Sequence, residues 1–253
     1  MQAAVFASPP KWHLAHTTWF FETFLLKPFI SEYKTPNQQY EVLFNSYYNG
    51  IGEQHPRDRR GLLSRPGLAA VLDYRRHVDE VMEQLLASEL AAENAAIAER
   101  CLLGIEHERQ HQELFFTDIK YSLAANPLYP ALSLGMPERA SVGSVQWLAF
   151  DPGLIEMGHG GRGFSFDNEH PRHAVFGQPF EIANRLVTNG EYQAFIEDGG
   201  YQRPELWLAD GWATVQEQAW EAPLHWVERG GETDREDGPL EFTLYGLIPR
   251  DAD

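Results

Sequence analysis

The spacing of apolar residues changes near Asn126, and this change divides the chain into two regions of different architecture. Before it, apolar side chains recur every three or four residues, which is the period of an amphipathic helix. After it, short apolar segments alternate with Gly, Trp and acidic residues, a pattern typical of short strands separated by turns. Because 253 residues suffice for two domains of ordinary size, we expect a helical domain followed by an irregular α+β domain.

The first region predicts three long helices, each bounded by proline. They are residues 8–28, a helix that begins at Pro66, and residues 95–127. Residues 33–64 lack a sustained period and predict a long loop, which at this length is expected to have a function. Helices joined in this way suggest an up-and-down bundle, whose common closed form has four helices. We therefore expect a further helix upstream of Met1.

The second region predicts four strands and one shorter helix. The strands are residues 145–150, 154–157, 174–176 and 180–182. The helix begins after Thr188, a good cap residue, and ends at Gly199. The predicted boundaries are a helical domain at residues 1–126, a linker at 127–143 and an α+β domain at 144–253.

The charge of the chain is strongly negative and unevenly distributed, with a net value of -17 at pH 7. Residues 1–150 carry 13 basic and 17 acidic side chains, whereas residues 151–253 carry 7 and 20. Such a charge repels phosphate backbones and anionic lipids. We therefore expect neither nucleic acid nor a membrane as a partner.

Cysteine usage and hydropathy indicate a cytoplasmic protein. The single cysteine, Cys101, cannot form an internal disulfide, which fits a reducing compartment. The densest apolar stretch, residues 17–30, is interrupted by Glu22 and Lys27, so it is shorter than the roughly 18 uninterrupted residues of a membrane span. The first residues also lack the basic segment of a signal peptide.

Two histidines of the third predicted helix form the strongest chemical signal. His107 and His111 stand four residues apart, so both imidazoles lie on one helix face and can bind one metal ion. The first predicted helix carries a second pair, His13 and His16, among aromatic residues, where a polar group is costly unless it is used. The alternative interpretation of His107 and His111 is that both lie on a solvated polar face of the helix.

The sequence His-Glu-x-x-His is also the motif of zinc metalloproteases, in which the glutamate activates a zinc-bound water. Glu108 occupies that position. The third histidine of the metzincin spacing is absent, because position 117 is Thr117. Asp118 lies on roughly the same face as His111 and could supply a carboxylate ligand. A zinc hydrolase is therefore the alternative from a different class of protein.

Six segments of the chain resemble, in the same order, the ergothioneine-biosynthesis sulfoxide synthases. They are residues 8–22, 43–48, 60–66, 107–113, 166–171 and 187–192. The first segment, which contains Trp-His-Leu-Ala-His, is similar to the opening of the DinB-like domain of that family. The last two resemble the formylglycine-generating-enzyme-like domain that follows it. The resemblance implies a DinB-like up-and-down helix bundle followed by an incomplete, irregular α+β domain of the C-type-lectin-like kind.

The resemblance implies a mononuclear non-haem iron(II) enzyme. Such an enzyme uses O2 to join a cysteine-derived thiol to C2 of the imidazole of Nα-trimethylhistidine, and it oxidises the sulfur to a sulfoxide. Matched motif to motif, the iron ligands are His16, His107 and His111, and His13 does not bind the metal. Three neutral imidazoles suit iron(II) and leave positions open for O2 and a thiolate, whereas zinc has no redox chemistry.

The resemblance also implies residues that bind the substrates. Gln110 matches a glutamine that helps to position trimethylhistidine. Arg57 and Arg60 match, by their spacing, arginines that bind carboxylates of the thiol in some members, and a planar guanidinium suits a carboxylate. The expected thiol is cysteine or γ-glutamylcysteine. A solvated basic loop is the alternative interpretation of the two arginines.

Members of this family are longer than 253 residues, so the resemblance implies a fragment shortened at both ends. The catalytic tyrosine of the family belongs to the C-terminal part beyond the resemblance, and no tyrosine here is assigned that role. Ovothiol-type and selenoneine-type synthases share the architecture and remain alternatives. An inactive remnant that binds a metal or a partner is a further alternative.

Overall fold

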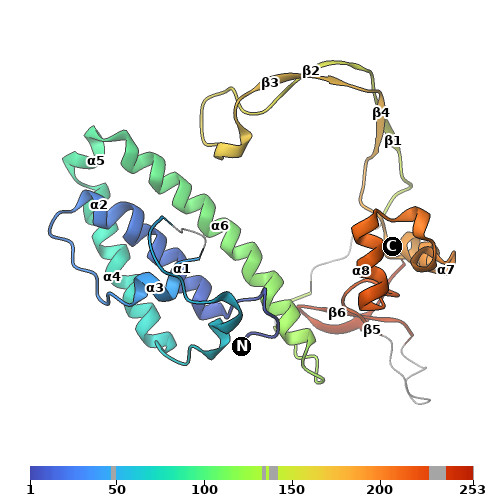
Figure 1. Cartoon of the computed structure of the whole chain (residues 1–253), viewed down its shortest axis with the longest axis horizontal. Helices are drawn as coiled ribbons and strands as arrows, with labels where there is room; N and C mark the ends of the chain where they lie inside the picture. Colours follow the sequence, from blue (N-terminus) through green and yellow to red (C-terminus); the bar gives the residue numbers. More distant parts are fainter. Residues whose placement is uncertain (47–49, 133–134, 137–141, 228–237, 253) are drawn as a thin grey trace. The chain divides into compact units, whose positions relative to one another are not determined.

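The computed structural model describes residues 1–46, 50–132, 135–136, 142–227 and 238–252. Their contacts divide the chain into two compact units, Met1–Pro127 and Leu128–Asp253 (Figure 1). The first unit is helical, and the second consists of short strands and short helices. The fold class predicted from the sequence is confirmed. No helix of the described residues is long and apolar enough to cross a membrane.

Three long helices form the first unit, as the apolar spacing predicts. They are α1 (Pro10–Phe21), α4 (Leu68–Leu86) and α6 (Ala95–Ala124). α1 begins with proline because the first helical position needs no N–H donor. α6 begins where the Asn94 side chain accepts a hydrogen bond from the Ala96 N–H. The connections contain α3 (Tyr40–Phe44), the 3₁₀ helix η2 (Arg57–Leu62) and α5 (Glu89–Glu93).

The first helix extends slightly beyond its predicted end. α1 continues without a break into a π-helical turn, η1 (Glu22–Leu26), and then into α2 (Lys27–Phe29). In the π-helical turn the Lys27 N–H donates to the Glu22 carbonyl, five residues earlier. The helix therefore passes Pro28 by one residue.

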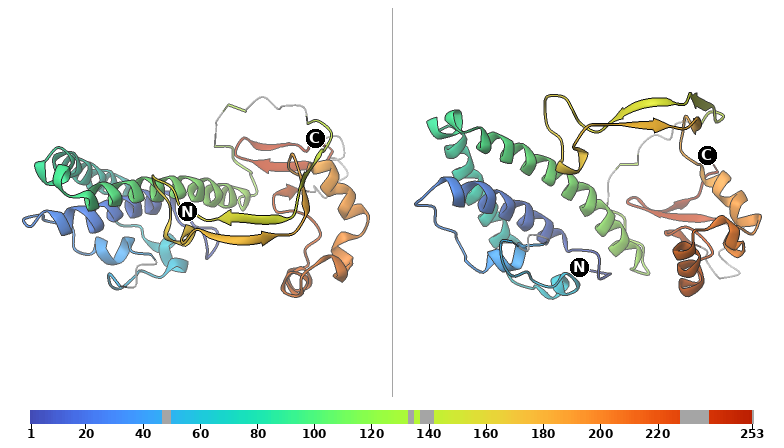
Figure 2. Two further views of the ribbon diagram at one scale, coloured as in Figure 1. Left: turned by 90° about the horizontal axis from the view of Figure 1, so that it is seen from above. Right: turned by 45° about the horizontal axis from the view of Figure 1, so that its top comes forward.

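α1 is the central helix of the first unit and contacts both α4 and α6 (Figure 2). The core residues are Trp12, Ala15, Trp19 and Phe20 on α1, Val71, Tyr74 and Val78 on α4, and Ile97 on α6. Each large apolar side chain that is fully buried stabilises the fold by roughly 1.5–3 kcal/mol. Because α1 is covered on several faces, its polar side chains are buried as well and need partners.

Gly104 allows α1 and α6 to approach each other closely. A glycine inside a helix costs roughly 1 kcal/mol relative to alanine, so its presence in α6 needs a reason. A Cβ atom at this position would lie 2.7 Å from the ring of Phe21 and 3.1 Å from the ring of Phe20. The close approach lies one helical turn before His107.

A buried carboxylate joins the first helix to α4. Glu22 is 1% exposed and accepts hydrogen bonds from the hydroxyl groups of Tyr33 at 2.7 Å and Tyr74 at 2.5 Å. Burial, followed by the neighbouring Glu22 carboxylate, raises the pKa of Tyr74, so its hydroxyl remains a donor. The two bonds offset the cost of removing the carboxylate from water.

The second unit contains the four strands predicted between residues 145 and 182. β1 (Trp147–Phe150) pairs with β4 (Phe180–Ala183), and β2 (Gly153–Met157) pairs with β3 (His173–Gly177), both antiparallel. The predicted helix is also confirmed as α7 (Asn189–Glu197). It begins with a capping box, in which Thr188 and Glu191 each accept a hydrogen bond from the other's backbone N–H.

Four further elements of the second unit have no counterpart in the sequence prediction. They are α8 (Ala209–Gln218) and the antiparallel sheet of β5 (Trp226–Val227), β6 (Leu240–Thr243) and β7 (Gly246–Pro249). β6 buries Leu240 and Phe242 alternately, but four residues give too short a period-two signal. The described residues of the unit also form three short 3₁₀ turns, η3 (Asp167–Glu169), η4 (Gly200–Gln202) and η5 (Pro204–Leu206).

Replacement of Tyr74 by Phe tests the contact between the first helix and α4. We expect Tyr74→Phe to lower the free energy of unfolding by about 1–3 kcal/mol, because it leaves a buried carboxylate with one donor fewer. Tyr33→Phe is the matched control, with a smaller expected loss because Tyr33 is only half-buried. Urea unfolding followed by the helical circular dichroism measures both. Equal stability of Tyr74→Phe and the unmodified chain would contradict this role of Glu22.

Candidate metal centre

The structure brings together the three histidines that were predicted as metal ligands. α1 supplies His16, and α6 supplies His107 and His111 from successive turns of one face. The candidate ligand nitrogens of the three side chains all lie within 4.8 Å of one another. The Nε2 atoms of His16 and His107 are 3.2 Å apart. Two nitrogens that share an ion at about 2.1 Å are separated by roughly this distance, so one ion can bind both.

Burial keeps the three imidazoles neutral. Desolvation, then the neighbouring His111, holds the pKa of His16 well below its usual value. Desolvation lowers the pKa of His107 to about 4. Desolvation, then His107 and His13, lowers the pKa of His111 to about 3. At neutral pH each ring therefore has one nitrogen with a lone pair, which is the form that binds a metal ion.

A backbone carbonyl fixes the orientation of His16. Its Nδ1–H donates a hydrogen bond of 2.5 Å to the carbonyl oxygen of Phe44, at the end of α3. The lone pair must then be on Nε2, the atom that faces His107. The ring is also stacked between aromatic neighbours, with its centroid 4.6 Å from Trp12 and 5.6 Å from Trp19. The long loop thus contributes to the site through a backbone atom, which no residue pattern predicts.

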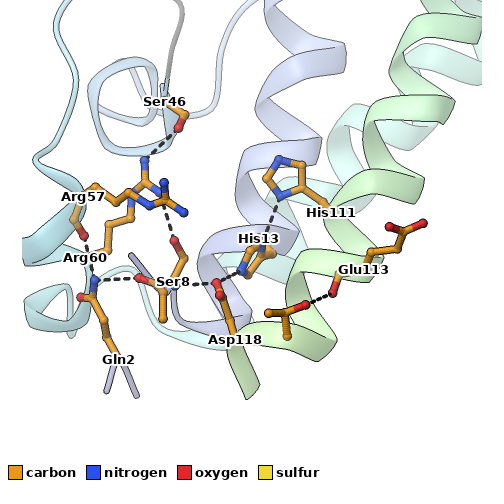
Figure 3. Close-up of polar contacts among 11 residues, drawn as sticks. Gln2, Ser8, His13, Ser46, Arg57, Arg60, His111, Glu113 and Asp118 are labelled. Atoms are coloured by element: carbon orange, nitrogen blue, oxygen red, sulfur yellow. Dashed lines mark hydrogen bonds and ion pairs between the residues drawn. The ribbon is translucent and has the colours of Figure 1, made fainter. Parts of the chain in front are cut away.

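The fourth histidine, His13, is buried beside the three. Its Nδ1 lies 2.9 Å from Nδ1 of His111, and its Nε2 lies 3.0 Å from Oδ2 of Asp118 (Figure 3). The same carboxylate oxygen accepts a hydrogen bond of 2.7 Å from the Ser8 N–H. Asp118, which the sequence offered as a possible metal ligand, is therefore engaged with His13 and the start of α1.

Glu108, the glutamate of the His-Glu-x-x-His motif, is engaged in an ion pair. Its Oε2 lies 3.1 Å from Nη2 of Arg75 on α4, and the Nε of Arg75 also donates to Asp79. A zinc hydrolase needs this carboxylate to take a proton from a metal-bound water. The ion pair with Arg75 competes with that role, although Glu108 also lines a cleft beside His111.

Two arginines of η2 lie close enough to act on the histidine cluster. Arg60 and Arg57 both lower the pKa of His111, after desolvation and the neighbouring histidines. Arg60 is 4% exposed, donates to the hydroxyl groups of Ser8 and Ser46 at 3.0 Å, and lies 3.5 Å above the Trp12 ring. Arg57 is exposed. Residues three apart in a 3₁₀ helix share one side, so both arginines lie on the same side of η2, Arg60 buried and Arg57 exposed.

The remaining candidate, Gln110, is exposed on α6 next to His111. A cleft of about 540 Å³ opens on another side of His111. Its lining includes His13 and His111 together with the apolar side chains of Leu14, Leu68, Phe115 and Phe116. A cleft of this size accommodates a small molecule.

The lowered pKa values predict that the metal-free chain loses stability as the pH falls. An unfolded histidine takes up a proton near pH 6.5, whereas His107 and His111 stay neutral in the fold until about pH 4 and about pH 3. The unfolded state then binds more protons, and the free energy of unfolding falls by up to about 1.4 kcal/mol per pH unit for each histidine. Urea unfolding at pH 7 and at pH 5.5, above the range in which carboxylates titrate, measures this slope. A His107→Gln variant should have a smaller slope, and equal slopes would contradict the prediction.

Replacement of Glu108 separates a metal site of three histidines from a hydrolase site. We expect Glu108→Gln to leave the affinity for Co(II) within about twofold, because the carboxylate pairs with Arg75. Because the glutamate of a zinc hydrolase is a general base and not a metal ligand, the peptidase assay separates the two kinds of site. We expect no peptide cleavage by the zinc-loaded chain, and cleavage that Glu108→Gln abolishes would show a hydrolase site. A titration of the metal-free chain with Co(II), beside a peptidase assay of the zinc-loaded chain, distinguishes the two.

Both units match known domain families. Residues 2–115 match the DinB superfamily, and residues 136–242 match the sulfatase-modifying factor enzyme 1-like domain. The first match contains all of the histidines described above.

Three curated relatives of the chain are named hercynine oxygenase. The protein of Mycolicibacterium smegmatis is 35% identical over 138 residues, which cover 53% of this chain and 31% of the relative. That of Mycolicibacterium thermoresistibile is 32% identical over 130 residues, or 51% of this chain and 29% of the relative. That of Mycobacterium tuberculosis is 43% identical over 77 residues, or 30% and 18%. The match thus spans less than a third of the length of each relative. The two domain matches in this order, together with the shared name of these relatives, support the resemblance of the chain to the ergothioneine-biosynthesis sulfoxide synthases.

Proposed function

We propose that the chain binds iron(II) through His16, His107 and His111 and forms the metal-binding part of an O2-dependent sulfoxide synthase. The observation that carries the proposal is the cluster of three imidazoles, two of them buried and that of His107 half-buried, whose candidate ligand nitrogens lie within 4.8 Å of one another. All three histidines come from two packed helices, α1 and α6, of the first compact unit.

The donor set fits iron(II). Imidazole nitrogen is a good ligand for iron, zinc and copper, and three protein ligands leave coordination positions open for small molecules. When bound, iron would supply the one-electron chemistry needed to activate O2, which zinc does not have. The name oxygenase of the three relatives favours iron over zinc.

The surroundings of the cluster suit an anionic thiol. Arg57 is exposed on the same side of η2 as the buried Arg60, and its guanidinium would bind a carboxylate of cysteine or γ-glutamylcysteine. Arg60 is already held by Ser8 and Ser46, and its buried charge would favour a carboxylate or a thiolate beside His111. We assign Gln110 to the second substrate, Nα-trimethylhistidine, which is hercynine. The half-buried free thiol of Cys101 suits a reducing, cytoplasmic environment.

The reaction that these residues would support replaces the S–H bond of the thiol and the C2–H bond of the hercynine imidazole by a C–S bond. O2 is the oxidant: one of its oxygen atoms ends on the sulfur, as a sulfoxide, and the other leaves as water. In this proposal the protein groups bind and orient the two substrates, and the apolar walls around His16 exclude water. The group that moves a proton in this reaction is not assigned to any residue of the chain.

Anaerobic loading with iron(II) tests the proposal. We expect one iron per chain, an affinity at least 100-fold weaker in His16→Ala, and no change in His77→Ala, which removes a half-buried histidine of α4 outside the cluster. Metal analysis after gel filtration measures the stoichiometry. No bound iron, or binding indifferent to His16, would contradict the proposed site. Iron binding without O2 consumption in the presence of hercynine and a thiol would favour an inactive remnant.

The arginine assignment makes a separate prediction for thiol binding. We expect Arg57→Ala to weaken the binding of γ-glutamylcysteine to the Co(II)-loaded chain by about 10-fold or more, because a hydrogen-bonded charge is worth about 1.5–3 kcal/mol. The matched control is Arg59→Ala, since Arg59 is an exposed arginine of the same helix. The visible spectrum of Co(II) reports the binding. Equal effects of the two variants would indicate a solvated basic loop.

A further inference from the structure

His13 is buried, polar and unexplained by the proposed set of ligands. It lies one turn before His16 on α1 and is 6% exposed. Removing such a polar ring from water costs free energy, and this cost is offset only if both ring nitrogens have hydrogen-bond partners. Both of them do, and the two partners are Asp118 and His111 on α6.

The chemistry of these contacts determines where the protons are. An ionised carboxylate only accepts hydrogen bonds, so the Nε2 of His13 must carry the proton that it shares with Oδ2 of Asp118. In a neutral imidazole the other nitrogen is then an acceptor. The Nδ1 of His13 can therefore accept a hydrogen bond from the Nδ1–H of His111, 2.9 Å away.

This arrangement leaves the lone pair of His111 on Nε2. We propose that Asp118 and His13 form a relay that fixes the tautomer and the ring orientation of His111, so that its Nε2 is ready to bind the metal. The proposal rests on the three-histidine site proposed above and assigns two positioning residues to it. Metal-binding histidines commonly donate their second N–H to a carboxylate or a carbonyl, and here a histidine stands between the carboxylate and the ligand.

The relay also ties the metal ligand to the start of α1. Oδ2 of Asp118 accepts the Ser8 N–H as well as the His13 N–H, and Ser8 in turn accepts from Arg60 through its hydroxyl (Figure 3). Asp118 lies seven residues after His111, two turns along the same face of α6. The carbonyl oxygen of Phe44 fixes the tautomer of His16 in the same way, because it accepts a hydrogen bond from the Nδ1–H of that ring. Among the described residues, Nδ1 of His107 has no such partner. Two of the three rings are thus held by fixed acceptors.

The first test reads the tautomer in the metal-free chain. Long-range ¹H–¹⁵N correlation spectra of the full chain, labelled at histidine nitrogen, distinguish Nδ1–H from Nε2–H rings. We expect His111 to carry its proton on Nδ1 and His13 on Nε2. The reverse assignment for His111 would overturn the relay, because Nε2 would then have no lone pair.

The second test measures Co(II) affinity in variants of His13. We expect His13→Phe to bind Co(II) about 10–100-fold more weakly than the unmodified chain, the usual effect of losing such a partner. His13→Asn should recover most of this loss, because the asparagine oxygen can accept the bond near the position of Nδ1. His77→Phe is the matched control, and the helical circular dichroism shows whether each variant folds.

The outcomes separate the relay from the proposed function. If the unmodified chain binds Co(II) and His13→Phe binds it equally well, the relay is wrong and the three-histidine site stands. If the unmodified chain binds no Co(II), the proposed function fails. The NMR measurement of the His111 tautomer then decides by itself whether the relay of Asp118 and His13 exists. Loss in His13→Phe without recovery in His13→Asn would overturn the assigned hydrogen bond, since general packing would then explain the loss.

Discussion

The packing of α1 along α6 is the contact on which the candidate metal centre depends. It brings His16 beside two histidines that follow it by about ninety positions in the sequence. Gly104 permits the close approach, and the aromatic side chains of α1 remove the imidazoles from water. If the two helices separated, the ligand nitrogens would separate with them. Formation of the helical unit and formation of the site are therefore the same event, and a bound ion would stabilise that unit.

The electrostatic environment of the cluster differs from that of the whole protein. The chain is acidic overall, yet the guanidinium groups of Arg60 and Arg57 contribute to the lowered pKa of His111. Burial and positive neighbours both disfavour protonated imidazole, so the rings keep their lone pairs for a metal ion. The same positive charge attracts carboxylates and thiolates. In the proposed function, the site would thus combine neutral metal ligands with positive charge suited to an anionic substrate.

The sequence predicts the long helices, the strands β1 to β4 and the helix α7, but it misses α8, the sheet of β5 to β7 and the contacts that backbone atoms make. Helical spacing gives the three long helices, and the four-residue spacing gives the shared face of His107 and His111. Spacing alone cannot choose between His13 and His16, which are one turn apart on the same helix; the family resemblance favours His16. In the structure His16 lies in the cluster, beside His107, and His13 contacts Asp118. The carbonyl of Phe44 and the short sheet of β5 to β7 leave no distinct residue pattern, so neither is predictable from the sequence.

X-ray absorption at the iron edge of the iron(II)-loaded chain tests the central claim most directly, because it counts and identifies the atoms bound to the metal. Three histidine ligands predict a first shell of nitrogen and oxygen at about 2.1 Å, with the outer-shell scattering of three imidazole rings. The same spectrum of His16→Ala should lose one ring. A shell dominated by carboxylate oxygen, or an unchanged spectrum in His16→Ala, would show that α1 and α6 do not build the site together.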